Sequence, residues 1–81
     1  MKIPRDLSGD DFIKKLLILG YNVIRQKGSH IRLSKMYNDG EHPITIPNHN
    51  PIKIGTLNNI LSDLSEKMKI SKSELVRQLF E

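Results

Sequence analysis

The chain has 81 residues, a formal net charge of +4 and no cysteine. This length suits a single domain with a small core, and a chain without cysteine excludes a disulfide scaffold, a thiolate metal site and a cysteine nucleophile. The first residues lack the apolar stretch of a signal peptide, and the longest apolar run, residues 16–19, is too short to span a bilayer. A soluble, intracellular protein is therefore predicted.

The positive charge is concentrated in the first half of the chain. No acidic residue occurs between Asp11 and Asp39. The same stretch carries six basic residues: Lys14, Lys15, Arg25, Lys27, Arg32 and Lys35. Such a distribution favours an anionic partner, either nucleic acid or an acidic protein.

The first predicted element is a helix that begins after Ser8. Ser8 can cap the helix, and Asp10 and Asp11 would lie in its first turn, where the helix dipole favours negative charge. Gly20 is placed to end the helix in a left-handed conformation. The apolar face would consist of Phe12, Ile13, Leu16, Leu17 and Leu19.

Three strands are predicted next, because the apolar period changes to two. We predict a hairpin formed by residues 21–27 and 30–35, with Gly28-Ser29 joining them in a type II′ turn. A polar connection, which contains Tyr37, leads to a third strand over residues 42–47. The two prolines of this strand, Pro43 and Pro47, predict an edge position.

Two helices follow a loop at residues 48–51. From Thr56 onward the apolar residues recur at helical spacing: Leu57, Ile60, Leu61 and Leu64. Ser71 and Glu74 have the spacing of a capping box for a last helix, whose apolar face holds Leu75, Val76, Leu79 and Phe80. The predicted fold is α+β, a single domain over residues 1–81. Its order is α-β-β-β-α-α, with a three-stranded antiparallel sheet covered by helices on one face.

The hairpin turn predicts which side chains share a face of the sheet. Lys27 would lie opposite His30, and Arg25 opposite Arg32, and period two puts all four on one side. On the other side, against the helices, Ile24 would lie opposite Leu33 and Gln26 opposite Ile31. The open side is then a cationic patch that contains an imidazole, and Thr45 could join it from the third strand.

This patch suits RNA. Lys and Arg neutralise phosphates, and a histidine can accept or donate a proton near neutrality. RNA cleavage requires that the 2′-hydroxyl lose a proton and that the 5′-oxygen gain one, while nearby cations stabilise charge on the phosphate. By pattern alone, however, a cationic sheet face more often binds without chemistry.

Three segments resemble the HicA toxin family. Lys27-Gly28-Ser29-His30 resembles the Lys-Gly-Ser-His signature of that family, and residues 44–49 resemble its Val-Thr-Val-Pro-x-His. Residues 55–61 resemble its Gly-Thr-Leu-x-x-Ile-Leu segment. The likeness spans residues 8–64 and leaves residues 65–81 as a C-terminal helical extension. Many members carry a second histidine directly after the first, where this chain has Ile31.

The resemblance implies a fold of the double-stranded-RNA-binding-domain type and cleavage of messenger RNA without a metal or other cofactor. His30 would be the catalytic residue, and the protein partner would be a HicB-like antitoxin that blocks the active face. The setting would be the prokaryotic cytoplasm.

The remaining candidates are residues that could contact phosphate. His49 lies in the Pro-x-His loop, and Lys53, Gly55 and Thr56 stand at a helix start, whose free amides can hold an anion. Equally, Thr56 could simply cap the helix, and Gly28 and Ser29 could simply make the turn. A three-histidine metal site with His42 is not expected, since no ligand motif fits the spacing. His42 itself offers no functional argument.

Two alternatives remain open beside a ribonuclease. One is an RNA-binding module that uses the same face without catalysis. The other is a protein-interaction subunit whose basic face meets an acidic partner. Salt-dependent RNA affinity would favour the first over the second. The oligomeric state and the second proton-transfer group of the reaction are not specified by the sequence.

Overall fold

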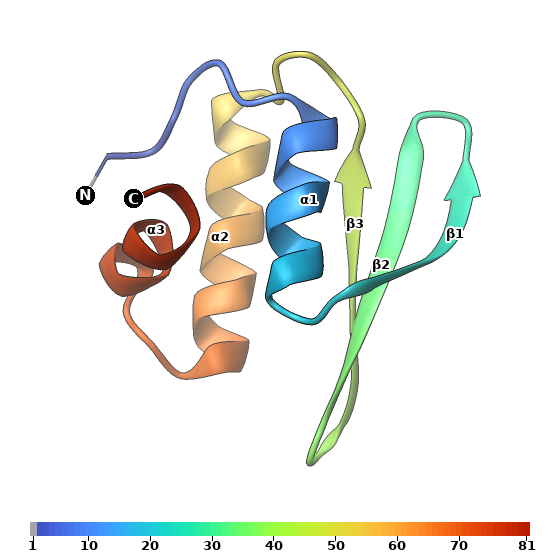
Figure 1. The fold of residues 1–81 in the computed structure, drawn as a ribbon, viewed down its shortest axis with the longest axis vertical. Helices are drawn as coiled ribbons and strands as arrows, with labels where there is room; N and C mark the ends of the chain where they lie inside the picture. The colour runs from blue at the N-terminus through green and yellow to red at the C-terminus, as the bar shows by residue number, and fades with distance from the viewer. Residues whose placement is uncertain (1) are drawn as a thin grey trace.

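The computed structural model describes residues 2–81 and confirms the predicted α+β fold (Figure 1). The elements in chain order are α1 (Gly9–Ile18), β1 (Asn22–Lys27), β2 (His30–Tyr37), β3 (Gly40–Pro47), α2 (Ile54–Met68) and α3 (Lys72–Phe80). The strands form one antiparallel sheet in the order β1-β2-β3, so β3 is an edge strand as its prolines predicted. The helices lie on one side of this sheet, with α3 farthest from it.

Helix α1 begins where the sequence predicts. The Ser8 hydroxyl accepts a hydrogen bond from the Asp11 amide at 3.1 Å, and Gly20, just beyond the helix, has φ 101°. Its buried apolar residues are Phe12, Ile13 and Leu16. Leu17, predicted to be part of the same face, is instead exposed, because the buried stripe of this short helix is narrower than predicted.

The core lies between α1, α2 and the inner face of β2 and β3. Alternate residues of the two strands are buried, namely Ile31 and Leu33 in β2 and Ile44 and Ile46 in β3. The helices bury Phe12, Leu16, Leu57, Leu61 and Leu64 against them. This alternation defines which side of β2 is open, because residues between the buried ones point the opposite way.

Strand β1 is the exception, since all six of its residues are exposed. It contains an irregularity between Val23 and Arg25, so Val23, not Ile24, pairs with Leu33. The predicted Ile24–Leu33 pair is therefore wrong, and Ile24 is 53% exposed. The extra residue forms a bulge, which breaks strict alternation along the strand. Because β1 extends beyond the helices, little burial exists to enforce the regular register.

The C-terminal extension completes the core. Helix α3 is capped by Ser71, whose hydroxyl accepts from the Glu74 amide at 3.0 Å, and Lys72 ties it to Ser62 of α2 at 2.9 Å. Leu75, Val76 and Leu79 are buried. Each buried side chain of this size contributes about 2 kcal/mol. The Phe80 ring packs on that of Phe12, with centroids 6.4 Å apart.

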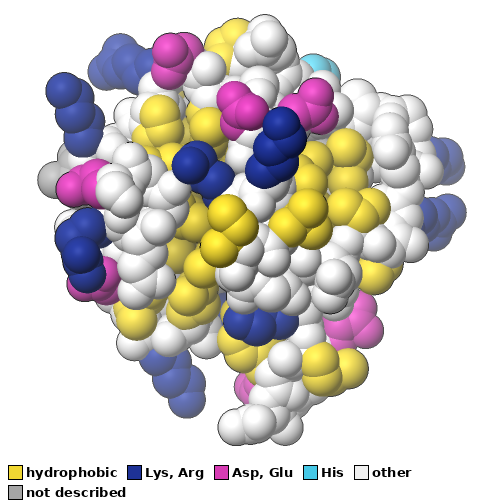
Figure 2. Space-filling view, in the orientation of Figure 1, with side chains coloured by type: hydrophobic (Ala, Val, Ile, Leu, Met, Phe, Trp, Pro, Cys, Tyr) yellow, Lys and Arg dark blue, Asp and Glu magenta, His cyan; other side chains and the backbone are white. Residues whose placement is uncertain are grey.

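The surface over the helices carries both apolar and charged side chains. Figure 2 shows apolar side chains gathered over the helical layer, with Lys and Arg side chains among them and others projecting at the edges. The large exposed apolar side chains are Leu17, Ile18, Val23, Ile24, Met36 and Ile54. No helix in residues 2–81 has the length and apolar character that crossing a membrane requires.

Candidate functional site

The β1–β2 hairpin brings the four predicted residues of the cationic patch together. Lys27 pairs with His30 and Arg25 pairs with Arg32, as predicted, and all four side chains are exposed. His30 and Arg32 alternate with the buried Ile31 of the same strand, so the patch lies on the sheet face away from the helices.

The turn that carries the patch has the expected geometry. Gly28 has φ 58°, and Lys69 is the one non-glycine residue with positive φ in the described chain, so Ser29 has a negative φ. This combination matches the predicted type II′ turn. A side chain at Gly28 would meet no neighbour, so the glycine is required by the backbone conformation and not by space.

Strand β3 extends the open face. Thr45 pairs with Arg32 and is exposed, as expected if it joins the patch, and Pro47 pairs with His30. The next position on this face of β2, Ser34, is buried between its pairs Asn22 and Pro43. The accessible part of the face therefore lies toward the hairpin turn.

The loop after β3 is tied to the hairpin turn and to α1. The Asn48 amide donates to the Ser29 carbonyl at 2.7 Å, and its side-chain amide donates to Asp10 Oδ1 at 3.1 Å. The Gly9 amide donates to the His49 carbonyl at 2.8 Å. A Cβ on Gly9 would lie 2.7 Å from the Asn48 Cα, so only glycine fits there. The loop thus fixes His49 next to the hairpin, a link that the sequence did not predict.

The other phosphate-contact candidates lie at the start of α2. Lys53 is the N-cap residue but supplies no side-chain hydrogen bond, and the first turn holds no acidic residue. The alternative interpretation of Thr56 as the cap is wrong, because the helix already begins at Ile54. Gly55 is exposed with open space around it. This helix start lies at the same end of the molecule as the hairpin turn (Figure 1).

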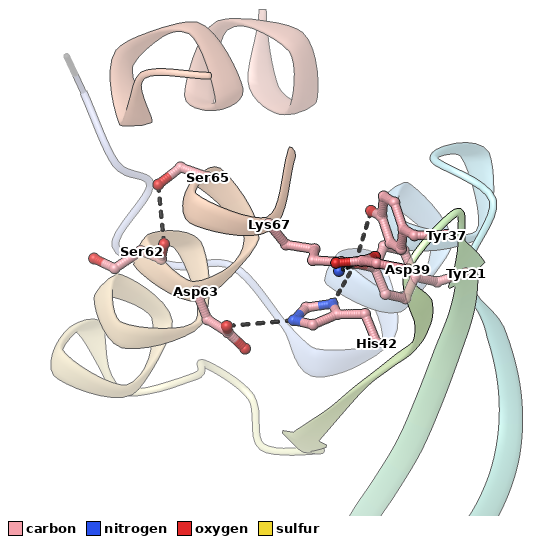
Figure 3. Close-up of polar contacts among 8 residues, drawn as sticks. All are labelled: Tyr21, Tyr37, Asp39, His42, Ser62, Asp63, Ser65 and Lys67. Carbon is pink, nitrogen blue, oxygen red and sulfur yellow. Dashed lines mark hydrogen bonds and ion pairs between the residues drawn. The ribbon is translucent and has the colours of Figure 1, made fainter. Parts of the chain in front are cut away.

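A second polar cluster, which was not predicted from the sequence, surrounds His42 (Figure 3). The Tyr21 hydroxyl lies 2.7 Å from His42 Nδ1 and 3.1 Å from the Tyr37 hydroxyl, while His42 Nε2 lies 3.3 Å from Asp63 Oδ1. Because a carboxylate can only accept, we assign the Nε2 proton to the His42–Asp63 bond. Nδ1 then accepts from Tyr21, which accepts from Tyr37.

This cluster, called here the His42 cluster (Tyr21, Tyr37, His42 and Asp63), is part of the fold's interior. Tyr21 is 1% exposed, and Tyr37, expected in the polar connection, is the last residue of β2 and half-buried. Burial raises the pKa of the Tyr21 hydroxyl, and its hydrogen bond with Tyr37 raises it further. The one sequence signal was the alternation that sets His42 on the same face of β3 as Ile44 and Ile46.

Charged groups surround the Tyr37 ring. The ammonium groups of Lys35 and Lys67 lie 5.0 and 4.9 Å from its centroid, within cation–π range. Lys67 also donates to Asp39 at 2.6 Å. This hydrogen bond lowers the pKa of the Asp39 carboxyl, and the charge of Lys67 adds to the effect.

No three His, Cys, Asp or Glu side chains of residues 2–81 are grouped so that they could hold a metal ion. His30, His42 and His49 do not converge: His30 and His49 belong to the hairpin end, whereas His42 is bonded to Tyr21 and Asp63.

A family model described as the HicA toxin of bacterial toxin–antitoxin matches residues 9–65. The chain belongs to the HicA toxin family. The matched residues include α1, the whole sheet and the loop that carries His49, and they end before α3. No curated protein and no solved structure matches the chain. Membership of the HicA family makes this protein the toxin component of a toxin–antitoxin system, which implies an antitoxin as its partner.

Proposed function

We propose that the protein is an endoribonuclease that cleaves messenger RNA at the open face of the hairpin, with His30 as a catalytic residue. The observation that carries the proposal is the exposed His30 side chain opposite Lys27 and beside the Arg25–Arg32 pair. A polyanion such as RNA would be attracted to this face. There it would meet His30, and histidine is a residue type that can transfer protons near neutrality.

The proposed reaction is an internal transesterification of RNA. The 2′-oxygen attacks the adjacent phosphorus as its proton leaves, and the bond from phosphorus to the 5′-oxygen breaks as that oxygen gains a proton. The products are a 2′,3′-cyclic phosphate and a 5′-hydroxyl, so neither water nor an oxidant is consumed. Histidine can serve at either proton transfer, and no step requires a metal ion or other cofactor.

The cations of the patch would bind the RNA and stabilise charge on the phosphate. Lys27 is the strongest candidate for contact with the reacting phosphate, because it pairs directly with His30. The further proposed RNA contacts are Arg25, Arg32, Gly28, Ser29, His49, Lys53, Gly55 and Thr56. At the start of α2, amides without a side-chain cap are suited to a second phosphate.

The proposed antitoxin is HicB-like and acts by covering this face. An antitoxin that covered Lys27, Arg25 and Arg32 would need acidic groups of its own, since burying unpaired cations is unfavourable. We place this activity in the cytoplasm, where messenger RNA is available.

Cleavage of a long single-stranded RNA in buffer with a chelator tests the proposal, with the wild type compared with His30→Ala. We expect the wild type to cut the RNA, and the variant to bind it without cutting. Equal cutting by both proteins would show that His30 is not catalytic.

An RNA-binding module without catalysis is the second candidate, and the general rarity of chemistry on cationic sheet faces favours it. If both proteins bind RNA in a salt-dependent manner and neither cuts it, this candidate replaces the ribonuclease. If neither binds RNA, the basic face serves a protein partner.

A further inference from the structure

The reaction proposed above needs two proton transfers, one at the 2′-oxygen and one at the 5′-oxygen. His30 can supply one of them. We propose that His49 supplies the other, as the general acid that protonates the leaving 5′-oxygen. This inference rests on the proposed function and names a second catalytic residue for it.

Of the three histidines in the chain, His42 is excluded from this role because both of its ring nitrogens are engaged, by Tyr21 and by Asp63. His30 and His49 are both exposed, and within residues 2–81 neither ring makes a hydrogen bond to the protein. They are therefore the two imidazoles that are free to exchange protons with a bound ligand.

The backbone holds these two histidines at one place. Pro47 pairs with His30 across β2 and β3, and paired Cα atoms of antiparallel strands lie about 5 Å apart. His49 is two residues beyond Pro47, which adds at most about 7.6 Å. The His49 amide bonds back to the Pro47 carbonyl at 2.9 Å, which shortens that path. Two histidine side chains with one phosphate group between them can bridge such a span.

Hydrogen bonds on both sides of His49 fix its position. The Asn48 amide is bonded to Ser29, next to His30, and the His49 carbonyl is bonded to Gly9 of α1. His49 is therefore held between the hairpin turn and the start of α1 by contacts on both sides of its position. Catalytic side chains that are held in place before the substrate binds owe much of their rate enhancement to this pre-organisation.

The two roles are assigned from the pairing of Lys27 with His30. Lys27 pairs with His30, so its ammonium group can stabilise the charge that builds on the phosphate as the 2′-oxygen attacks beside His30. In this assignment His30 takes the proton from the 2′-hydroxyl as its oxygen bonds to phosphorus, and His49 gives one to the departing 5′-oxygen.

The test compares an ordinary RNA with one in which sulfur replaces the 5′-oxygen at the cleaved linkage. A thiolate is a good leaving group without protonation, because thiols are far more acidic than alcohols. On ordinary RNA we expect His49→Ala to slow cleavage about 10²–10⁴-fold, the usual contribution of a general acid. On the sulfur-containing RNA we expect His49→Ala to cleave within about tenfold of the wild type, whereas His30→Ala remains impaired.

The matched control is Asn50→Ala, an exposed neighbour in the same loop that we expect to cleave both substrates normally. A second readout is the pH dependence of the cleavage rate. The wild type should show a bell-shaped profile, and His49→Ala should lose the fall at high pH that reports loss of the acid's proton.

The outcomes distinguish a failure of the role proposed for His49 from a failure of the proposed ribonuclease function. If the wild type and His49→Ala cleave ordinary RNA equally while His30→Ala does not, the role of His49 is wrong and the ribonuclease stands. The role is also wrong if sulfur fails to restore His49→Ala. If the wild type cleaves neither substrate, the proposed function and this inference fail together.

Discussion

The sheet carries a histidine near each of its ends, and the two have opposite surroundings. His30, next to the hairpin turn, is exposed among Lys27, Arg25 and Arg32. His42, near the β2–β3 turn, is half-buried, and its ring is bonded on one side to Tyr21 and on the other to Asp63. One residue type, on neighbouring strands of one sheet, therefore meets open solvent in one place and the interior in the other.

This difference indicates which histidine is available for chemistry. A ring whose two nitrogens are engaged links three segments of the chain, here Tyr21 just before β1, strand β3 and helix α2, and its loss removes hydrogen bonds from the fold. A ring without protein partners contributes little to stability and can exchange protons with a ligand. Mutations at the two ends should therefore separate activity from stability.

The largest expected effect is the loss of cleavage in His30→Ala without loss of stability. We expect the rate to fall about 10²–10⁴-fold, because one proton transfer loses its catalyst. The midpoint of thermal unfolding should stay near that of the wild type, since an exposed side chain without partners contributes within about 0.5 kcal/mol. A clearly lower midpoint would mean that His30 supports the fold, and the contrast with His42 would disappear.

The converse effect is expected for His42→Ala. Removing the ring leaves Tyr21 without its acceptor in a buried setting, so the free energy of unfolding should fall by about 2 kcal/mol. At a temperature where the variant remains folded, its RNA cleavage rate should equal that of the wild type. Equilibrium unfolding in urea measures the first quantity. A folded His42→Ala that cannot cleave RNA would assign the His42 cluster to the active site.

A smaller effect, with its own pH dependence, is expected for Tyr21→Phe. Losing the buried hydroxyl should cost about 1 kcal/mol at neutral pH. The pKa of the Tyr21 hydroxyl is raised on folding, so its contribution is present below the ordinary value of 10.0 and is lost as the pH rises above it. The stability difference between wild type and Tyr21→Phe should therefore shrink above pH 10. A difference that grows there would contradict the burial of this hydroxyl.

At the hairpin end, the cations should set the salt dependence of RNA binding. Replacing Lys27 with Gln should lower the slope of log affinity against log salt by about 0.7, the value for one contact with single-stranded nucleic acid. Lys67→Gln, which removes a cation near the His42 cluster, is the matched control and should leave the slope unchanged. Equal slopes for all three proteins would remove Lys27 from the RNA interface.

The smallest effect is expected for Asp39→Asn, which changes the exposed carboxylate that Lys67 bonds. Hydrogen bonding to Lys67 lowers the pKa of the Asp39 carboxyl below its ordinary 3.8. The stabilisation from this pair is therefore present above that pH and is lost as the pH falls through the lowered value. Wild type and variant should differ slightly at pH 7 and converge in strong acid, as followed by thermal unfolding. Convergence at alkaline pH instead would contradict the direction of the shift.

The local features of this fold could be predicted from the sequence. The Ser8 and Ser71 caps, the hairpin turn and the Lys27–His30 pair depend on residues within a few positions of each other, where steric and hydrogen-bonding preferences are strong. The predicted pairing of Ile24 was wrong. A regular register is enforced by burial of one face of a strand, and β1 extends beyond the helices that would bury it.

Contacts between distant segments could not be predicted in this way. His42 and Asp63 are 21 positions apart, and Asp10 and Asn48 are 38 apart, so nothing in the local pattern relates them. Their geometry depends on how the sheet and helices pack. This is why the sequence indicated His30 as a candidate but did not indicate that the loop would hold His49 beside it.

The most direct test of the central claim is to identify the ends left on a defined RNA after incubation with the protein in chelator-containing buffer, by mass spectrometry. Attack by the 2′-hydroxyl, assisted by histidine at the hairpin face, predicts a 2′,3′-cyclic phosphate and a 5′-hydroxyl. Fragments that end in a 3′-hydroxyl and a 5′-phosphate would show that another nucleophile attacked the phosphate, and would contradict the mechanism proposed for His30.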